Sequence, residues 1–336
     1  MYRKRISFLL LFVCLLMLVY VKEPPKNPVQ KSIAKSNELQ EESEAGPIRN
    51  ETRKKLIPLG VNEKITSISF SDFQSKEKFR FERKNNDWVM TVPVCFPALA
   101  TILNAMVNLI EMSERGKPFR VRQSENTNEY GFSKPAFQIC IATDQNSNEK
   151  CLLLGNPSPL LPACYAKFES ENEIFLLDFN FRTAFENRTP YSLLQKQVFP
   201  FALRAAERLE IQYGGQSAGY YKKANEWYLE NSAEPLSGEE IEKLLGALNY
   251  LHIREFVNGD SNDPDFGFET NVKGKIRVKF SNGWTQILFL GREVPVKFGY
   301  YGRLADWPNI FLISKEKLDE ILAISEQMTN PPANQP

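Results

Sequence analysis

The chain contains the stretch Tyr130-Gly131-Phe132, followed by Leu154-Gly155, Tyr165-Ala166-Lys167 and Ile174-Phe175-Leu176. The same landmarks return in the same order as Phe266-Gly267-Phe268, Leu290-Gly291, Tyr301-Gly302-Arg303 and Ile310-Phe311-Leu312. Each recurs after 136 residues, as the step from 131 to 267 shows. Four landmarks that keep one spacing indicate an internal duplication. We therefore expect two tandem copies of one folded unit.

Length and composition agree with two globular units. The 336 residues are 42% hydrophobic and 25% charged, which is enough apolar material for two cores. The 42 basic and 41 acidic residues give a net charge of +1, so the chain lacks the basic excess of a nucleic-acid-binding protein. A single histidine and the absence of a C-x-x-C pair argue against a histidine base, a zinc ribbon and a thioredoxin-type site. We expect no metal and no cofactor.

The N-terminus has the pattern of a membrane signal. Arg3, Lys4 and Arg5 precede an apolar run from Ile6 to Val21. A basic segment followed by such a run is typical of a secretory signal or a signal anchor. No small-x-small cleavage pattern follows, so we expect an uncleaved single-pass anchor over residues 1–21, with its basic side in the cytoplasm. A cleaved signal peptide is the alternative.

Residues 22–56 are rich in Pro, Glu, Lys, Ser, Asn and Gln, which predicts a disordered tether. The predicted domains are a first copy over 57–188, a bridge with the second copy over 189–327, and a disordered tail over 328–336. Each copy begins with alternating, strand-like segments, such as Ile65 to Phe70, and continues with a stretch of helical apolar spacing. Pro97 is expected to open the first helix, and Ser237 with Glu240 has capping-box spacing for the second. The fold class is therefore α+β, with one main helix packed on a mostly antiparallel sheet in each copy.

At one strand, the apolar positions of the two copies do not align. Ile139 and Ile141 align with Lys275 and Arg277, whereas the apolar positions of the second copy are Ile276 and Val278. A shift of one residue moves every side chain to the opposite face of a sheet. Either small compensating insertions intervene, or the inner faces of the copies differ. In the same part of the first copy, Cys140 and Cys151 flank a polar turn. They can form a disulfide across the hairpin outside the cytoplasm, or serve as small buried hydrophobic residues.

The succession of strands, Trp88, helix and the quoted landmarks resembles the bacterial domain-of-unknown-function family 4340. The resemblance extends from Ile65 to Leu322, and the second copy departs from it with Phe266 in place of tyrosine and Arg292 in place of asparagine. Members of that family are often tandem, membrane-anchored and extracytoplasmic, and their genes lie near transporters of the ATP-binding-cassette (ABC) type. The resemblance thus implies an accessory role in the bacterial envelope. It carries no catalytic residue.

Four residues are candidates for a binding face because they recur in both copies: Trp88 with Trp227, and Lys167 with Arg303. The tryptophans follow a turn and can instead pack inside each copy, and a solvated strand face explains the two cations equally well. Other polar groups have plainer explanations. Glu239 and Glu240 complement a helix dipole, His252 lies at a helix end, and the acidic stretch from Asp260 to Asp265 lacks the glycine and glutamate of a calcium loop.

From these features we expect a protein of the bacterial inner membrane, with most of the chain periplasmic or otherwise extracytoplasmic. The expected function is that of a membrane-tethered interaction or scaffold module without enzymatic activity, and membrane transporter subunits are the expected partners. An extracytoplasmic ligand-binding protein with a cleft between the copies is the alternative. A hydrolase is a third hypothesis that would need a cleft with convergent carboxylates.

Overall fold

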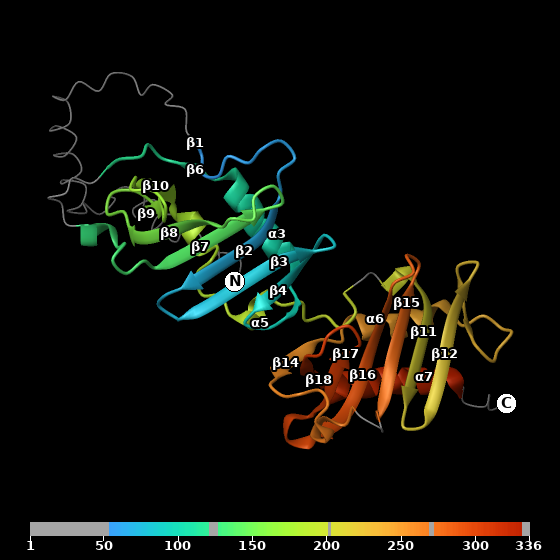
Figure 1. Cartoon of the computed structure of the whole chain (residues 1–336). Coiled ribbons are helices and arrows are strands. Elements are labelled where there is room, and N and C mark those ends of the chain that lie inside the picture. Colours follow the sequence, from blue (N-terminus) through green and yellow to red (C-terminus); the bar gives the residue numbers. More distant parts are fainter. Residues whose placement is uncertain (1–53, 121–126, 201–202, 269–271, 331–336) are drawn as a thin grey trace, which may run out of the picture. The chain divides into compact units, whose positions relative to one another are not determined.

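The computed structural model describes residues 54–120, 127–200, 203–268 and 272–330 (Figure 1). The expected anchor and nearly all of the expected tether lie outside these residues. Within them, no helix is both long enough and apolar enough to cross a membrane. The first copy includes residues before the expected start at 57, because β1 (Lys54–Lys55) pairs with β6 (Glu114–Arg115) and the side chain of Leu56 is buried.

The first copy is built on one eight-stranded sheet in which every pair of neighbours is antiparallel. In spatial order its strands are β10 (Phe175–Asp178), β9 (Ala163–Phe168), β8 (Lys150–Pro157), β7 (Phe137–Thr143), β2 (Ile65–Asp72), β3 (Glu77–Lys84), β4 (Asp87–Val92) and β5 (Phe96–Pro97). Helix α3 (Ala100–Met112) connects the half of the sheet made by β2 to β5 with the half made by β7 to β10. Short helices η1 (Thr127–Tyr130), α4 (Phe179–Thr183) and α5 (Pro190–Leu193) complete the copy.

The second copy repeats this plan except at one edge. Its eight antiparallel strands, in spatial order, are β13 (Glu226–Leu229), β12 (Gln216–Lys223), β11 (Ala206–Tyr213), β15 (Gly274–Phe280), β16 (Thr285–Val294), β17 (Gly299–Leu304), β18 (Ile310–Ser314) and β14 (Ile253–Val257). The edge differs because β14 lies beside β18, whereas β5 of the first copy lies beside β4. Its helices are η2 (Leu203–Ala205), α6 (Gly238–Asn249), η3 (Pro264–Phe266), η4 (Pro295–Lys297) and α7 (Lys315–Thr329). The expected α+β class with mostly antiparallel sheets is thus confirmed.

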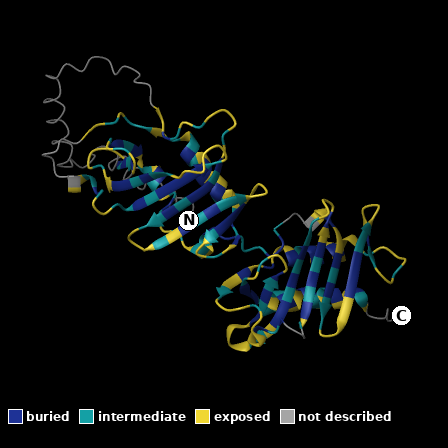
Figure 2. Ribbon diagram, viewed as in Figure 1, coloured by how far each residue is buried: buried dark blue, intermediate teal, exposed yellow. Residues whose placement is uncertain are grey.

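Each sheet has one buried and one more accessible face. Buried and partly exposed residues alternate along the strands, as the dark blue and teal bands show (Figure 2). Ile68 and Phe70 on β2, and Leu209 and Ile211 on β11, belong to the buried set. This alternation is what an antiparallel sheet shows when helices and loops cover one side and solvent reaches the other.

The main helices use the same apolar spacing in both copies. In each helix four buried residues follow successive steps of three, one and three: Leu103, Met106, Val107 and Ile110 in α3, and Ile241, Leu244, Leu245 and Leu248 in α6. Ala247 of α6 is also buried. The Ser237 hydroxyl accepts a hydrogen bond from the backbone N–H of Glu240, as its capping spacing predicts. The prediction that Pro97 opens the first helix is wrong. Pro97 belongs to β5, and α3 begins at Ala100 after the uncapped Leu99.

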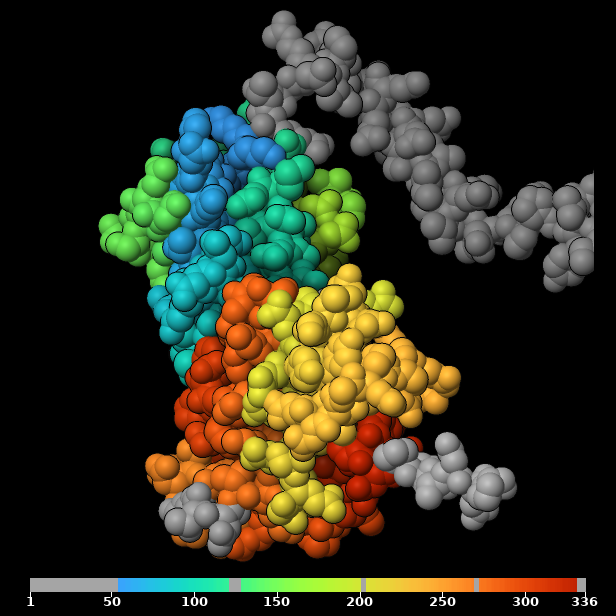
Figure 3. All heavy atoms as spheres, turned by 90° about the vertical axis from the view of Figure 1, so that its right-hand side faces the viewer, coloured from blue at the N-terminus to red at the C-terminus, as the bar shows by residue number. Residues whose placement is uncertain are grey.

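The expectation of one main helix in each copy is wrong for the second copy, which has both α6 and α7. These helices contact each other, and in the space-filling view α7, in red, reaches the surface beside yellow and orange residues of its own copy (Figure 3). Leu318, Ile321 and Met328 of α7 are buried. Helix α7 therefore extends past residue 328, where the expected tail begins, and ends at Thr329.

The mismatch in phase between the copies is resolved by compensating length changes. Ile141 pairs with Ile68 on the neighbouring strand, and Val278 pairs in the same way with Leu209. Val278 is therefore the counterpart of Ile141, one residue later than the landmark spacing predicts. The second copy has one more residue between Gly267 and β15 and one fewer in the turn between β15 and β16. Both copies consequently present the same inner face.

The bridge expected to begin at residue 189 forms backbone hydrogen bonds with residues of both copies. Toward the first copy, the N–H of Leu99 donates to the carbonyl of Leu193 (2.8 Å) and that of Gln195 donates to Pro97 (2.9 Å). Toward the second copy, the N–H of Val198 donates to the carbonyl of Leu251 (3.0 Å). Leu193, Leu194, Val198 and Phe199 are buried. The bridge is thus part of the folded structure.

Candidate functional site

The duplicated landmarks come together in each copy as one local cluster. In the first copy η1 ends at Tyr130, and Gly131 turns the chain with a φ of 81°. Gly267 makes the equivalent turn with a φ of 76°. A positive φ of this size strains most other residues, so glycine is required at both turns. The turn places the carbonyl oxygen of Tyr130 against Gly155, where a Cβ would overlap it.

Aromatic rings hold these turns against the sheet. The ring of Tyr165 on β9 stands edge-on to that of Tyr130, with centroids 4.9 Å apart and an interplanar angle of 88°. In the second copy Tyr301 and Phe266 have the same separation and an angle of 87°. The edge-to-face geometry is favourable for aromatic pairs. The departure from tyrosine to phenylalanine in the second copy therefore preserves the ring packing.

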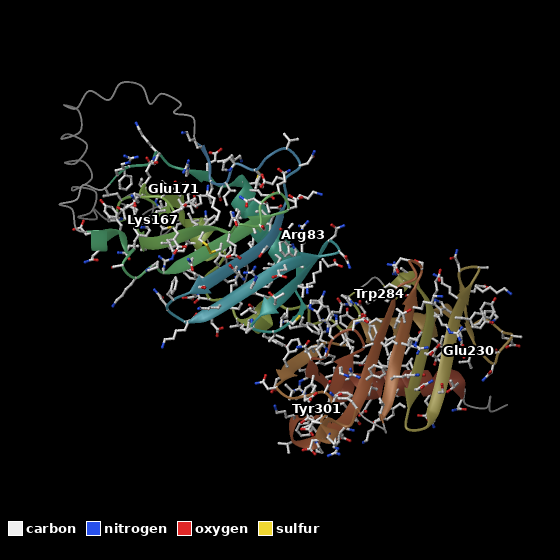
Figure 4. The ribbon with its side chains drawn as sticks, in the orientation of Figure 1. Arg83, Lys167, Glu171, Glu230, Trp284 and Tyr301 are labelled. Atoms are coloured by element: carbon white, nitrogen blue, oxygen red, sulfur yellow. A yellow bond between two sulfur atoms is a disulfide. The ribbon has the colours of Figure 1, made fainter. Side chains whose placement is uncertain are left out.

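Lys167 and Arg303, the two cations of the expected binding face, belong to the same clusters. Lys167 Nζ lies 5.3 Å from the centroid of the Phe132 ring. The Arg303 guanidinium carbon lies 5.7 Å from the Phe268 ring and 5.1 Å from the Phe289 ring. Both cations are partly buried, on β9 and β17 (Figure 4, where Lys167 and Tyr301 are labelled). The aromatic contacts give both cations a role in packing the landmark cluster.

The two tryptophans of the expected binding face are buried in their own copies. Trp88 is 2% exposed and Trp227 is 6% exposed. The Trp88 Nε1–H donates to Asn104 Oδ1 on α3 (3.0 Å), and the Arg83 guanidinium carbon lies 5.0 Å from its ring centroid. These contacts favour the reading in which the tryptophans pack inside each copy. The four recurring candidates therefore do not form one surface.

The accessible face of the second sheet carries a connected set of charges. Arg208 on β11 is ion-paired with Glu210 (3.2 Å) and with Glu230, and Arg277 on β15 is ion-paired with Glu210 (3.1 Å). These side chains are 19–49% exposed. A hollow of about 310 Å³ lies among them, lined by Arg208, Glu210, Arg277, Lys279, Thr285 and Ile287. We call this surface the charged face.

The corresponding face of the first sheet carries the cysteines instead. Cys140 on β7 and Cys151 on β8 lie directly opposite each other and form a disulfide. Arg80 on β3 is ion-paired with Glu82 (3.0 Å) and with Glu149 (2.7 Å). Of the two readings of the cysteine pair, the structure shows the disulfide. Among the described residues, the one group of side chains close enough together to bind a metal ion is Cys140, Glu149 and Cys151. Its two sulfur atoms are bonded to each other in the disulfide.

Sequence reasoning missed a polar network in the second copy. The Tyr213 hydroxyl donates to the Tyr300 hydroxyl (3.1 Å), and Lys315 Nζ donates to Tyr300 (3.1 Å) and is ion-paired with Glu293 (3.1 Å). These residues come from β11, β17, α7 and β16, so no local pattern connects them. In the first copy Cys164 occupies the position of Tyr300. Only the internal comparison of the copies could have drawn attention to Tyr300.

The environment of this network opposes proton transfer near neutral pH. Desolvation and the hydrogen bond with Tyr300 raise the pKa of Tyr213. The hydrogen bonds to Tyr300 and Glu293 raise the pKa of Lys315. A general base or acid works best with a pKa near the operating pH, and both shifts lead away from it. The network is better suited to fastening α7 to the sheet.

The remaining polar candidates have ordinary local partners. His252 is exposed, and its Nδ1 lies 2.8 Å from the Tyr250 carbonyl oxygen. Glu239 is ion-paired with Lys243 (2.8 Å), which lowers the pKa of its carboxyl. In the acidic stretch, Asp260 and Asp263 accept hydrogen bonds from the backbone of Asn262 and Asp265. The stretch therefore forms turns, and its described carboxylates do not converge.

The fold and clusters define a sheet-rich α+β protein made of two copies of one unit. Its family follows from a comparison with protein-family models: the family described as "Domain of unknown function (DUF4340)" matches residues 88–270. The match covers more than half of the chain, which therefore belongs to this family. It begins at Trp88 in β4 and ends before β15, a narrower range than the expected resemblance from Ile65 to Leu322. Comparisons with curated proteins and with solved structures give no match.

Proposed function

We propose that this chain is a membrane-tethered extracytoplasmic interaction module that serves as an accessory to an ABC-type transport system. The observation that carries the proposal is the charged face, a sheet surface that is open to solvent and on which charges of both signs are fixed by ion pairs. The basic and apolar N-terminal segment supports the tether. The disulfide supports a location outside the cytoplasm, where disulfides persist.

The charged face has the chemistry of a surface that recognises proteins. Glu210 is held between Arg208 and Arg277, so these side chains lose little further freedom when a partner binds. The hollow beside them is partly open to solvent, and its lining residues are charged, polar or aliphatic. Complementary charges on a partner would set its orientation and its rate of association. Such a surface fits a polar contact with a membrane protein better than the enclosure of a substrate.

The test is crosslinking of the tagged full chain in cells, gentle detergent extraction and mass spectrometry of the captured proteins. We expect a transporter permease or its ATPase to be enriched with the unaltered chain and lost with R277E/K279E, which reverses charge on the charged face. The matched control is K243E/K317E, because these two lysines lie in exposed ion pairs on α6 and α7. Equal recovery of the transporter with both variants, or no transporter with any chain, would contradict the proposal.

A second candidate function, extracytoplasmic ligand binding, is favoured by a hollow of about 640 Å³ at the β11–β12 hairpin. Its lining includes Gln212, Tyr213, Gln216, Ser217, Lys273 and Lys275, and none of the described residues that line it is a carboxylate. Hydrogen-bond donors without a competing acid suit a small anionic ligand. This hollow lies within the second copy, whereas a cleft between the copies was expected. Thermal unfolding of the full chain with a series of inorganic and organic anions tests this candidate, and a K273M/K275M variant provides the control.

A further inference from the structure

Two loops expose apolar side chains at equivalent positions of the two copies. One joins β8 to β9 and the other joins β16 to β17. Leu160 in the first loop is 89% exposed, and Val296, which follows it by the landmark spacing of 136 residues, is 92% exposed. A proline precedes each of them, Pro159 and Pro295. Phe298 adds a second exposed apolar side chain, at 75%, to the second loop. We call residues 158–162 and 294–298 the apolar tips.

Both tips are held by the same backbone contact. The N–H of Phe179 donates to the Pro162 carbonyl (3.0 Å), and the N–H of Lys315 donates to the Phe298 carbonyl (3.1 Å). These donors and acceptors are again 136 residues apart. Phe298 has a φ of 47°, a conformation that is costly for a bulky residue. Arg254 Nη1 donates to the carbonyls of Lys297 (2.9 Å) and Phe298 (3.2 Å) and thereby fixes the second turn.

This arrangement places apolar surface in contact with water at the same position of both copies. Water-exposed leucine, valine and phenylalanine contribute nothing to the core, yet both copies keep an apolar residue at the same tip. Neither tip contains a carboxylate, and the second carries Lys297 between its two apolar residues. Lys297 Nζ is ion-paired with Glu255, which lies outside the tip on β14 (2.7 Å). Apolar side chains beside a cation suit the boundary between lipid headgroups and acyl chains.

We propose that each apolar tip inserts into the interfacial region of a lipid bilayer. This inference rests on the proposed function, because the N-terminal tether supplies the nearby membrane. If residues 22–53 form a random coil, a tether of about 30 residues would have a reach on the order of 30 Å, which would keep the bilayer at a high effective concentration. Under that condition one or two apolar residues per tip are enough to bias the folded part toward the surface. A protein partner would need a separate apolar pocket for each protruding tip.

The experiment measures the depth of each tip in a membrane. The full chain is prepared with C14S and C95S, which leaves the disulfide and the buried Cys164 as its remaining cysteines. L160C and V296C are labelled separately with an environment-sensitive fluorophore and reconstituted into phosphatidylcholine vesicles. Y250C is the matched control, because Tyr250 is 67% exposed and lies at the end of α6. Nitroxide-labelled lipid is then added to quench any fluorophore that reaches the acyl chains.

We expect the L160C and V296C labels to be quenched severalfold more strongly than the Y250C label. Quenching of these labels no stronger than that of the Y250C label would overturn the inference. A photoreactive group at position 296 that crosslinks to protein instead of lipid would also overturn it. Flotation of the chain with the vesicles separates the two proposals. A chain that does not float contradicts the tether and the proposed function. A chain that floats without quenching at the tips contradicts the insertion alone. Circular dichroism of each variant verifies that it is folded.

Discussion

The carbonyl oxygen of Tyr130 lies against Gly155 with no room for a side chain between them. The carbonyl oxygen of Phe266 has the same relationship to Gly291. The close approach of a turn to a neighbouring strand therefore explains why this glycine recurs in both copies.

A methyl group at either glycine should push the turn away from the sheet. We expect G155A and G291A each to lower the free energy of unfolding by about 1–3 kcal/mol, the usual cost of overpacking. Urea unfolding followed by tryptophan fluorescence measures this change. G246A is the control, because a Cβ at this α6 position would meet nothing within 4 Å. It should stabilise the protein by about 0.5–1 kcal/mol through helix propensity. Equal effects of G155A and G246A would refute the explanation.

The two free cysteines of the described chain should differ sharply in reactivity. Cys95 is exposed and Cys164 is buried, and burial raises the pKa of the Cys164 thiol to about 11. The thiolate is the reactive form, so near neutral pH both the burial of Cys164 and its raised pKa should slow its reaction with a thiol reagent. In a C14S chain we expect a thiol reagent to titrate Cys95 rapidly and Cys164 only after denaturation. Rapid labelling of a C14S/C95S chain would show that Cys164 is accessible.

The disulfide between Cys140 and Cys151 should stabilise the first copy. It closes a short loop, with a sequence separation of 11 residues, and constrains the unfolded chain. We expect C140A/C151A to lower the free energy of unfolding by about 2–4 kcal/mol. The measurement is urea unfolding of the variant beside the oxidised parent. An unchanged free energy of unfolding after a reductant opens the disulfide of the unaltered chain would show that the disulfide does not stabilise it.

Alkaline pH should weaken the protein through Tyr213. Its pKa is raised in the folded state, whereas in the unfolded chain it ionises near pH 10. Above that pH the unfolded state binds fewer protons than the folded state, so stability falls as pH rises. We expect a shallower fall for Y213F between about pH 8 and about pH 11, measured as the urea midpoint. Parallel curves for Y213F and the parent would exclude this linkage.

Arg303 should contribute to stability through the rings beneath it. Replacement by methionine keeps much of the aliphatic stem and removes the charge that faces Phe268 and Phe289. We expect R303M to cost about 0.5–1 kcal/mol, in line with cation–π pairs at partly exposed sites. A double-mutant cycle with F289L isolates the pairwise contribution. A coupling energy of zero between Arg303 and Phe289 would contradict the cation–π contribution and favour a solvated side chain.

The duplication, the sheet class and most hairpins could be predicted because they depend on local patterns and on spacing. The β7–β8 hairpin lies where the polar turn between Cys140 and Cys151 was expected. The pairing of β14 with β18 could not be predicted, since Ile253 and Ile313 are far apart in the sequence. The same distance in sequence concealed the network of Tyr213, Tyr300, Lys315 and Glu293. Trp88 and Trp227 were visible in the sequence, but their role was not. A residue that recurs in both copies can be shared for packing as readily as for binding.

Each sheet has two parts that meet along one seam, β2 with β7 in the first copy and β11 with β15 in the second. The seam has four strands on each side in the first copy, and three and five strands in the second. On either side of the seam, most neighbouring strands are also consecutive in the sequence, so those pairings form locally. The seam instead joins residues as distant as Ile68 and Ile141. Because distant pairings carry the largest loop-closure cost, seam closure governs the speed at which each copy folds. A nascent chain that has emerged only as far as α3 would carry β2 with its seam edge bare, and that edge is where off-pathway strand pairing would begin.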